Sequence, residues 1–166
     1  RGLGDVYKRQ GQDTPRPDRS GQKKSLVQRL VASRSTLDQL PHPIDRLLLD
    51  VPCSGLGTLH RRADARWRQT PDSVRSLTDL QAALLDEANN WVKPGGVAVY
   101  ATCTIHEPEN SAIIRQFLDR HPNWSIEPPP ADSPLQAFTQ PEGWLEVWPH
   151  RWHMDGFFMV RLRRQT

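Results

Sequence analysis

Two cysteines and one aspartate stand at positions where they could form a reaction centre. Asp50 follows the apolar residues 47–49 and precedes a Pro-Cys-Ser-Gly turn that contains Cys53, and Cys103 follows the apolar residues 97–101. A thiolate is a competent nucleophile, and basic groups or helix N-termini nearby lower the pKa of a cysteine. Two thiols and a carboxylate in one cleft could supply a nucleophile, a proton-handling group and an orienting group.

Plainer interpretations of the cysteines stay open at this point. A free cysteine is most often a small buried hydrophobic residue. The two thiols could also form a redox pair, although the sequence holds no Cys-x-x-Cys motif. Two cysteines some fifty residues apart do not indicate a secreted disulfide scaffold. We assign no residue as a metal ligand.

Apolar runs bounded by turn-forming residues predict the strands that position this chemistry. We expect strands over residues 44–51, 97–101 and 157–162. The first should be buried on both faces of a sheet. Helical patterns alternate with the strands, so the element order predicts an α/β fold with a mostly parallel sheet. Neighbouring parallel strands end at one edge, where Asp50, Cys53 and Cys103 should meet.

Two amphipathic helices are predicted between the strands. The first follows a capping signal at residues 70–73 and extends through residues 76–92. Its predicted inward face is Leu77, Leu80, Leu84, Ala88 and Trp91. The second opens at residues 107–110, and its predicted inward face is Ile113, Ile114, Phe117 and Leu118. Residues 127–142 are predicted to form a mobile Pro-rich loop, and residues 144–148 an extended segment.

The N-terminal region has a different composition from the rest. Residues 4–10 resemble the translation of a transposase-end sequencing adapter, so we exclude residues 1–10 from the fold prediction. Residues 11–24 are rich in Pro, Arg and Gly without an apolar period, and we expect them to be disordered. A short helix is predicted within residues 25–40. Residues 25–166 are thus expected to form the folded part.

Composition limits the class of protein. The chain has 166 residues, the length of one domain, and a formal net charge of +3, which permits a nucleic-acid partner without requiring one. It contains no apolar run long enough for a transmembrane helix and no signal-peptide pattern. These features predict a soluble, cytoplasmic protein that is not attached to a membrane.

A basic and aromatic cluster follows the first cysteine. It consists of His60, Arg61, Arg62, Arg66 and Trp67. Guanidinium groups bind phosphates, and Trp or Arg planes stack on unpaired bases. The cluster therefore suggests RNA contacts, although an exposed loop with solvated arginines explains the same composition.

Four motifs together resemble the Sun (Nop) family of RNA cytosine-5 methyltransferases. They are residues 50–55, residues 102–104, the Pro108-x-Asn110 motif and residues 155–158, in the order and at the spacing of the family. The resemblance runs from about residue 44 to residue 163. It implies the C-terminal half of a Rossmann-like, S-adenosylmethionine-dependent methyltransferase fold, with a mostly parallel sheet and an antiparallel final strand.

The resemblance also implies roles for the three site residues. Cys103 corresponds to the nucleophile that adds to carbon 6 of cytosine, which activates carbon 5 for methylation. Cys53 corresponds to the cysteine that assists adduct breakdown and product release, and Asp50 to the acid that contacts the cofactor and helps hold the base. The implied cofactor is S-adenosyl-L-methionine and the implied substrate small-subunit ribosomal RNA.

Three alternatives remain. They are a transfer RNA substrate, a non-catalytic RNA-binding module, and an amino-methyltransferase, against which the two cysteines argue. One departure from the family also matters: no Gly-rich cofactor turn is found within residues 1–40. We therefore expect this chain to bind the cofactor weakly and to be inactive by itself.

Overall fold

The computed structural model describes residues 43–166. The predictions for the adapter-like and disordered residues 1–24 and for the helix within residues 25–40 lie outside these residues. The described strands are β1 (Ile44–Asp50), β2 (Val92–Thr102), β3 (Trp124–Ile126), β4 (Leu145–Val147) and β5 (Phe157–Arg164). The α-helices are α3 (Ala65–Arg68), α4 (Pro71–Trp91), α5 (Ser111–Arg120) and α6 (Pro149–Trp152). Three 3₁₀ turns complete the set: η3 (Leu56–Thr58), η4 (Glu107–Glu109) and η5 (Pro134–Phe138).

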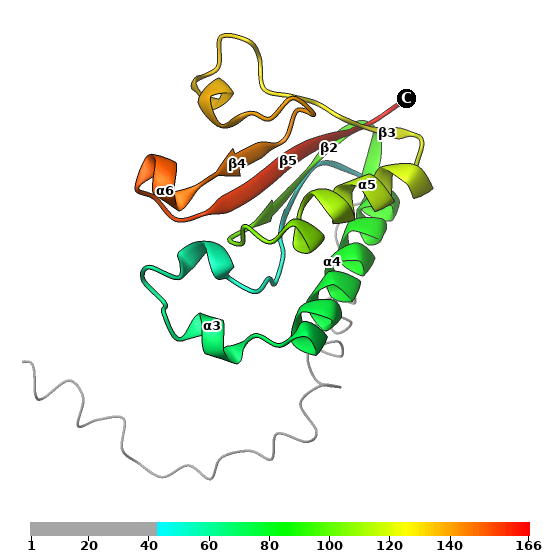
Figure 1. Cartoon of the computed structure of the whole chain (residues 1–166). Helices are drawn as coiled ribbons and strands as arrows, with labels where there is room; N and C mark the ends of the chain where they lie inside the picture. The colour runs from blue at the N-terminus through cyan, green and yellow to red at the C-terminus, as the bar shows by residue number, and fades with distance from the viewer. Residues whose placement is uncertain (1–42) are drawn as a thin grey trace, which may run out of the picture. The chain divides into compact units, whose positions relative to one another are not determined.

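The strands form one mixed sheet with the order β1-β2-β5-β3, and β4 also pairs with β5 (Figure 1). β1 and β2 are parallel, with Leu47 opposite Ala98, whereas β5 is antiparallel to β2. α4 connects β1 to β2 and α5 follows β2, which is the strand–helix alternation of an α/β fold. The predicted α/β class and the antiparallel final strand are therefore confirmed.

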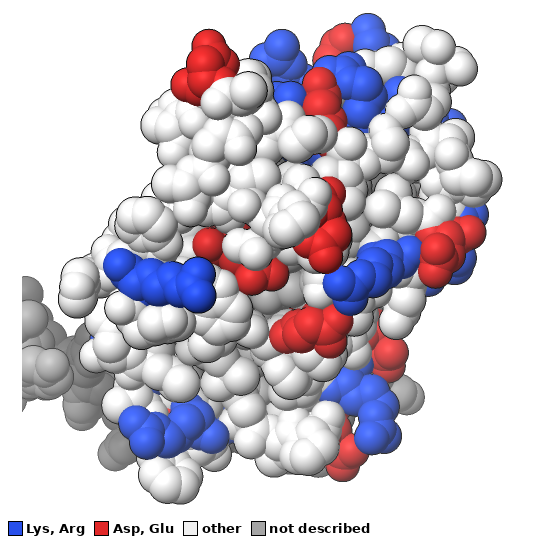
Figure 2. All heavy atoms as spheres, turned by 45° about the horizontal axis from the view of Figure 1, so that its top comes forward, with Lys and Arg blue, Asp and Glu red and all other residues white. Residues whose placement is uncertain are grey.

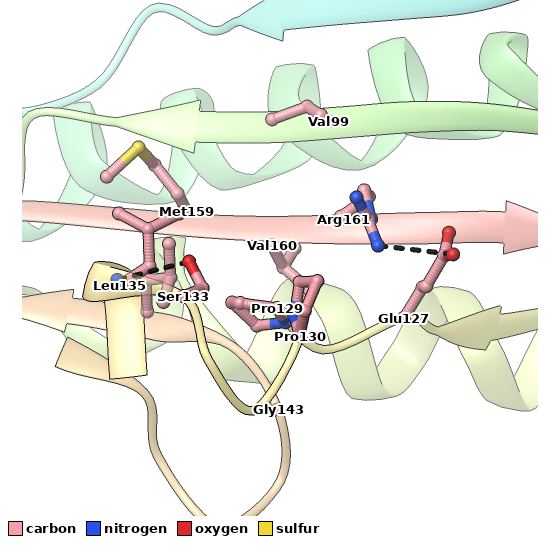
Figure 3. A pocket seen from close by; sticks show the side chains of 11 residues that line it. Val99, Glu127, Pro129, Pro130, Ser133, Leu135, Gly143, Met159, Val160 and Arg161 are labelled. Carbon is pink, nitrogen blue, oxygen red and sulfur yellow. Dashed lines mark hydrogen bonds and ion pairs between the residues drawn. The ribbon is translucent and has the colours of Figure 1, made fainter. Parts of the chain in front are cut away.

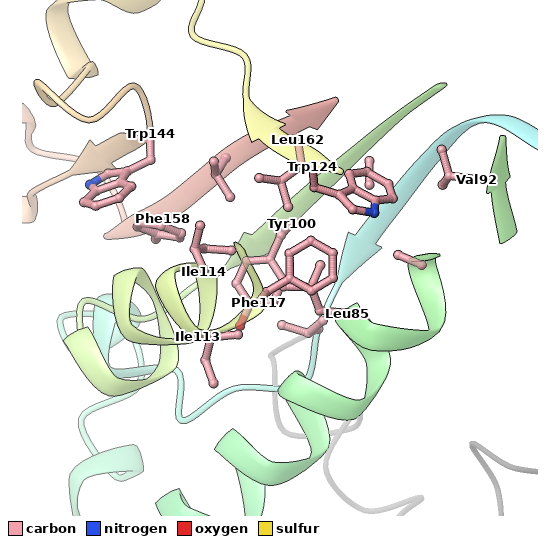
Figure 4. Packing of buried hydrophobic residues seen from close by; sticks show 14 residues of the cluster. Leu85, Val92, Tyr100, Ile113, Ile114, Phe117, Trp124, Trp144, Phe158 and Leu162 are labelled. Atoms are coloured by element: carbon pink, nitrogen blue, oxygen red, sulfur yellow. The ribbon is translucent and has the colours of Figure 1, made fainter. Parts of the chain in front are cut away.

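Helices α4 and α5 cover one face of the sheet and enclose the core (Figure 4). Strand residues at alternate positions point toward the helices, as a pleated sheet requires. The buried apolar core is Val51, Leu85, Ala88, Val92, Ala98, Tyr100, Ile113, Ile114, Phe117, Trp124, Trp144, Phe158, Val160 and Leu162. Phe117 and Trp124 meet edge to face with ring centroids 5.6 Å apart. The inward face predicted for α5 is thus confirmed.

The start of α4 is as predicted, and its buried face is confirmed in part. Thr70 and Ser73 form a reciprocal capping box, which satisfies backbone donors at the helix start. Ala88 and Trp91 are buried as predicted, whereas the predicted Leu77, Leu80 and Leu84 are only partly buried. The fully buried side of the helix centres on Gln81 and Leu85. The apolar pattern missed this offset because a polar residue, Gln81, takes a core position through its hydrogen bonds.

The prediction that β1 is buried on both faces is wrong for the described residues. Leu47 and Leu49 pack against the core, but the side chain of Leu48 is 68% exposed. β1 is an edge strand of the described sheet, and the helices α4 and α5 cover only the opposite face. None of the described helices is long and apolar enough to cross a membrane.

Candidate active site

The two cysteines lie side by side at the carboxyl ends of β1 and β2. The Sγ atoms of Cys53 and Cys103 are 3.3 Å apart, within hydrogen-bond distance for sulfur. The parallel pairing continues past the strands, because the backbone amide of Val51 donates to Ala101 O at 3.2 Å. Both thiols are free and half-buried. Parallel pairing of consecutive strands therefore brings two thiols together across fifty residues of chain.

The hydrogen bond makes the two thiols unequal. Donation from the Cys53 thiol lowers the pKa of Cys103 to about 6, and the charge of Arg62 acts in the same direction. The same hydrogen bond, together with burial, raises the pKa of Cys53. The directions of the two shifts favour Cys103 as the thiolate and Cys53 as the protonated partner that can return a proton to it.

Asp50 lies at the same edge, on the last residue of β1. Its side chain is exposed, and its charge raises the pKa of Cys103, against the hydrogen bond from Cys53. An exposed carboxylate at the end of a strand can accept hydrogen bonds from the hydroxyl or amino groups of a polar ligand. Asp50 is therefore available to a polar ligand at this edge.

A buried polar network holds the Cys53 loop (residues 51–55). Glu109, from η4, is fully buried and accepts from the backbone amide of Ser54 at 2.8 Å and from the Ser54 hydroxyl at 2.5 Å. Gln81, from α4, donates to Glu109 at 3.1 Å and to the carbonyl of Pro52 at 2.8 Å. We call Ser54, Gln81 and Glu109 the Glu109 clamp.

A second set of hydrogen bonds holds the loop that follows β2. Asn110 donates to the carbonyl of Thr104 at 3.0 Å and accepts from the Thr102 hydroxyl at 2.7 Å. The Thr104 hydroxyl lies 2.8 Å from the Ser54 hydroxyl. Because the Ser54 proton is donated to Glu109, the Thr104 hydroxyl is the donor between the two. The two cysteine loops are therefore bonded to each other beneath the thiols.

Sequence reasoning missed Glu109 and Gln81. Glu109 is the unspecified position of the Pro108-x-Asn110 motif, and Gln81 lies among apolar residues of a helix. The available signal was the spacing of Gln81, which falls one turn before Leu85 and two turns before Ala88 on the buried side of α4.

Backbone hydrogen bonds between distant segments also stabilise the sheet edge that carries the two cysteines. The amide of Gly57 donates to the carbonyl of Cys103 at 3.1 Å, and the amide of Gly156 donates to the carbonyl of Gly57 at 2.8 Å. A Cβ atom at Gly57 would lie 2.1 Å from Gly156 O, so only glycine fits there. The segment before β5 is thereby bonded to η3, which is itself bonded to the backbone of Cys103.

The basic loop (residues 59–68) lies on the surface after these turns. Arg61 forms an ion pair with Asp155, and His60 Nε2 lies 3.3 Å from the same carboxylate. Arg62 and Arg66 are exposed, and Trp67 is 82% exposed with the Arg66 guanidinium 5.8 Å from its ring centroid. Of the five predicted RNA contacts, two therefore interact with Asp155, and the other three are exposed without a contact to it.

One face of the described part of the chain carries charges of both signs. On the face drawn in Figure 2, basic and acidic side chains alternate, so no broad basic field covers it.

A separate cavity lies on the sheet face opposite the helices (Figure 3). It measures about 240 Å³ and is lined by Val99 and Met159 from the sheet and by residues of the Pro-rich segment, among them Pro129 and Leu135. Its charged groups, Arg161 and Glu127, are paired at 3.1 Å. It contains neither thiol and is therefore separate from the sheet edge at which Cys53 and Cys103 meet, which we call the cysteine edge. The described residues contain no group of His, Cys, Asp or Glu suited to a metal ion.

Comparison with known proteins gives a consistent family. The family described as 16S rRNA methyltransferase RsmB/F matches residues 18–163. A probable ribosomal RNA small subunit methyltransferase B of Synechocystis is 50% identical over 122 residues, which cover 73% of this chain and 27% of that protein. A ribosomal RNA small subunit methyltransferase F of Aeromonas salmonicida is 40% identical over 128 residues, covering 75% and 27%.

A solved structure has the same fold. The structure of NSun6 from Pyrococcus horikoshii with SFG matches with a TM-score of 0.65 and 25% identity, covering 79% of this chain and 33% of that one. The chain therefore spans about a quarter of the length of the curated relatives named above. The resemblance inferred from the four sequence motifs is confirmed.

Proposed function

The chain belongs to the RsmB/F family of 16S rRNA methyltransferases, and on that premise we propose that its cysteine edge methylates carbon 5 of cytosine in small-subunit ribosomal RNA. The observation that supports this proposal is the hydrogen-bonded pair of unequal thiols. Carbon 5 of cytosine is a poor nucleophile, and a thiolate that adds to carbon 6 overcomes this by covalent catalysis.

The residues of the site suit each step of that chemistry. The Cys103 thiolate adds to carbon 6, the new S–C bond makes carbon 5 nucleophilic, and the methyl group is accepted there. After carbon 5 loses its proton, the S–C6 bond breaks and the electron pair returns to Cys103. The Cys53 thiol, 3.3 Å away, stabilises the departing thiolate by donating to it. This arrangement supports a nucleophilic Cys103 and a product-releasing Cys53.

The family's cofactor, S-adenosylmethionine, would supply the electrophilic methyl group. Asp50 suits its polar groups, since its carboxylate is exposed beside Cys103. It is the one cofactor contact that we assign among the described residues. We propose that this 166-residue chain binds S-adenosylmethionine only weakly and is inactive alone. Isothermal calorimetry tests this directly, and micromolar binding by this chain would contradict it.

The basic loop supplies the proposed RNA contacts. His60 and Arg61 are joined to Asp155, whereas Arg62, Arg66 and Trp67 remain available for phosphates and unstacked bases. A cytosine must leave its stack to reach the thiols, at a cost of a few kcal/mol. Contacts to the flanking nucleotides would offset that cost.

A covalent trap tests the proposed reaction. Residues 43–163 replace the matching segment of the Synechocystis relative, which provides the remainder of a full-length protein. The chimaera is incubated with RNA containing 5-fluorocytosine and S-adenosylmethionine, because fluorine at carbon 5 blocks proton loss and stops the reaction at the adduct. We expect a stable protein–RNA adduct, absent in Cys103→Ala.

The second cysteine provides the matched control. On ordinary RNA, Cys53→Ala should accumulate an adduct that the parent chimaera releases, because the partner that assists product release is missing. An active chimaera that forms no adduct with 5-fluorocytosine RNA would remove the mechanism. Parallel reactions with transfer RNA and small-subunit ribosomal RNA distinguish the two substrate classes.

A further inference from the structure

We propose that Glu109, together with Gln81, is a positioning residue that holds Cys53 in hydrogen-bond contact with Cys103. The inference rests on the proposed function for its catalytic meaning, but its geometry stands by itself. No atom of Glu109 or Gln81 bonds to a thiol. Both act on the backbone that carries Cys53.

The Glu109 clamp grips the peptide on both sides of Cys53. Before the cysteine, the carbonyl of Pro52 accepts from Gln81 at 2.8 Å. After it, the amide of Ser54 donates to Glu109 at 2.8 Å, and its hydroxyl donates to the same carboxylate at 2.5 Å. With both neighbouring peptide units held, the Cα–Cβ direction of Cys53 is set by the clamp.

The clamp also fixes the position of Cys53 relative to Cys103. Glu109 lies six residues after Cys103, and its own carbonyl accepts from the Tyr100 hydroxyl at 2.7 Å, on the strand that delivers Cys103. Glu109 therefore joins the Cys53 loop to the element that carries the nucleophile. The distance between the two Sγ atoms depends on this connection.

Gln81 adds an argument from stability. Its side chain is fully buried, yet among the described residues its Oε1 atom has no hydrogen-bond partner. A buried polar atom without a partner costs about 1–3 kcal/mol, so an apolar side chain would suit this core position better. Core packing therefore does not explain a glutamine at this position, whereas the two hydrogen bonds that it donates, to Pro52 and Glu109, do explain it.

Loss of the clamp should be visible at Cys103. A hydrogen bond weakens steeply as its geometry degrades, and the Cys53 donor is the largest cause of the lowered pKa of Cys103. The other groups that face Cys103 are Asp50, which raises its pKa, and Arg62, which lowers it. Neither belongs to the clamp, so both should keep their effect in clamp variants.

The sign of the change separates positioning from charge. If Glu109 acted only as a nearby negative charge, replacing it with glutamine would lower the pKa of Cys103, because a like charge disfavours the thiolate. If it acts by holding Cys53, its loss raises that pKa. Glu109→Asp sharpens the distinction, since it keeps the charge and shortens the reach by one methylene group.

The experiment measures iodoacetamide alkylation of Cys103 against pH in the whole 166-residue chain, with peptide mass spectrometry to assign each cysteine. In the unaltered chain, the alkylation of Cys103 should reach half its maximal rate at a pH of about 6, and we call this pH the midpoint. Glu109→Asp and Glu109→Gln should move the midpoint upward by about 1–2 pH units, toward the value of a free thiol. This readout needs no methyltransferase activity, so its failure is distinct from failure of the proposed function.

Two matched controls accompany these variants. Glu107→Gln removes an exposed carboxylate from the same 3₁₀ turn, and Ile114→Val weakens the core under α5 without touching the clamp. Both should leave the midpoint in place. An unchanged or lowered midpoint in folded Glu109→Asp overturns the proposal, as does an equal rise in Ile114→Val.

Ser54→Ala covers the case in which neither Glu109 variant folds. It removes the hydroxyl that is hydrogen-bonded to Glu109 and Thr104. It keeps the backbone amide of Ser54, which still donates a hydrogen bond to Glu109. The midpoint should rise in the same direction by a smaller amount. A folded Ser54→Ala chain with the midpoint of the unaltered protein contradicts the positioning role.

Discussion

The Cys53 loop and the basic loop are separated in the chain only by η3, but they are held in different ways. In the Cys53 loop, Val51 and Ser54 are buried, and a fully buried carboxylate bonds the backbone. In the basic loop most side chains are exposed, and Arg61 is 64% exposed in its ion pair with the largely buried Asp155. The first loop is fixed by buried side-chain hydrogen bonds, and the second by local backbone hydrogen bonds and by ion pairs of exposed arginines.

The difference matches what each loop is proposed to do. The proposed reaction needs the two sulfur atoms at a set distance, and buried, hydrogen-bonded polar groups provide that rigidity. RNA contacts need side chains that adapt to a flexible strand, and exposed arginines on a weakly held loop provide that freedom. The predictions below test whether the contrast holds, from the largest effect to the smallest.

Removal of the Glu109 carboxylate should have the largest effect. Glu109→Ala removes the buried acceptor of three hydrogen bonds, two from Ser54 and one from Gln81, and the expected loss is about 3–5 kcal/mol in the free energy of unfolding. Urea denaturation followed by tryptophan fluorescence measures it. Glu107→Ala, on the same turn, is the control and should cost less than about 1 kcal/mol. Equal losses for the two variants would contradict a buried clamp.

Each of the two loops contributes one group that lowers the pKa of Cys103, so this pKa allows their effects to be compared. Cys53→Ala removes the donor that lowers this pKa most, whereas Arg62→Ala removes a charge on the exposed basic loop. Alkylation requires the thiolate and therefore rises as pH passes through the pKa. We expect Cys53→Ala to move the midpoint from about 6 upward by about 1–2 pH units. Arg62→Ala should move it upward by only a few tenths, because solvent screens its charge. A larger shift from Arg62→Ala would reverse the comparison.

Removal of a single hydroxyl group, in Tyr100→Phe, tests how Glu109 is anchored. Burial raises the pKa of Tyr100, so its hydroxyl stays protonated and donates to the Glu109 carbonyl. Tyr100→Phe removes this one bond and keeps the ring that meets Phe158 edge to face. The free energy of unfolding should fall by about 1–2 kcal/mol. A neutral result would mean that the Glu109 backbone does not need this anchor.

The sequence was informative where local rules govern the structure. The capping signal at Thr70 and the period of Ile113, Ile114 and Phe117 follow from propensity and helix geometry, and both were confirmed. The meeting of Cys53 and Cys103 followed from the parallel order of consecutive strands. These predictions needed no knowledge of side-chain contacts.

The remaining features depend on contacts between distant residues. Glu109 and Gln81 are polar residues in core positions, and a hydrophobic pattern treats them as surface residues. The exposure of Leu48 depends on what covers the outer face of β1, which its apolar run does not encode. Short elements such as β3 depend on pairing with β5, because three residues have too little local preference to be recognised.

The Arg61–Asp155 pair should have the smallest effect on stability. Arg61 is largely exposed, and a surface ion pair contributes about 0–1 kcal/mol. We expect Arg61→Ala to lower the free energy of unfolding by less than about 1 kcal/mol, with a still smaller loss in 1 M salt, where surface charges are screened.

The same loop should show its role in RNA binding instead. In the chimaera with the Synechocystis relative, Arg62→Ala and Arg66→Ala together should weaken RNA binding and reduce the slope of log affinity against log salt by about 1–2, as each lost phosphate contact predicts. Their effect on unfolding should be as small as that of Arg61→Ala. If the double variant destabilises the fold but leaves the salt slope unchanged, the basic loop is a structural element and the contrast between the two loops fails.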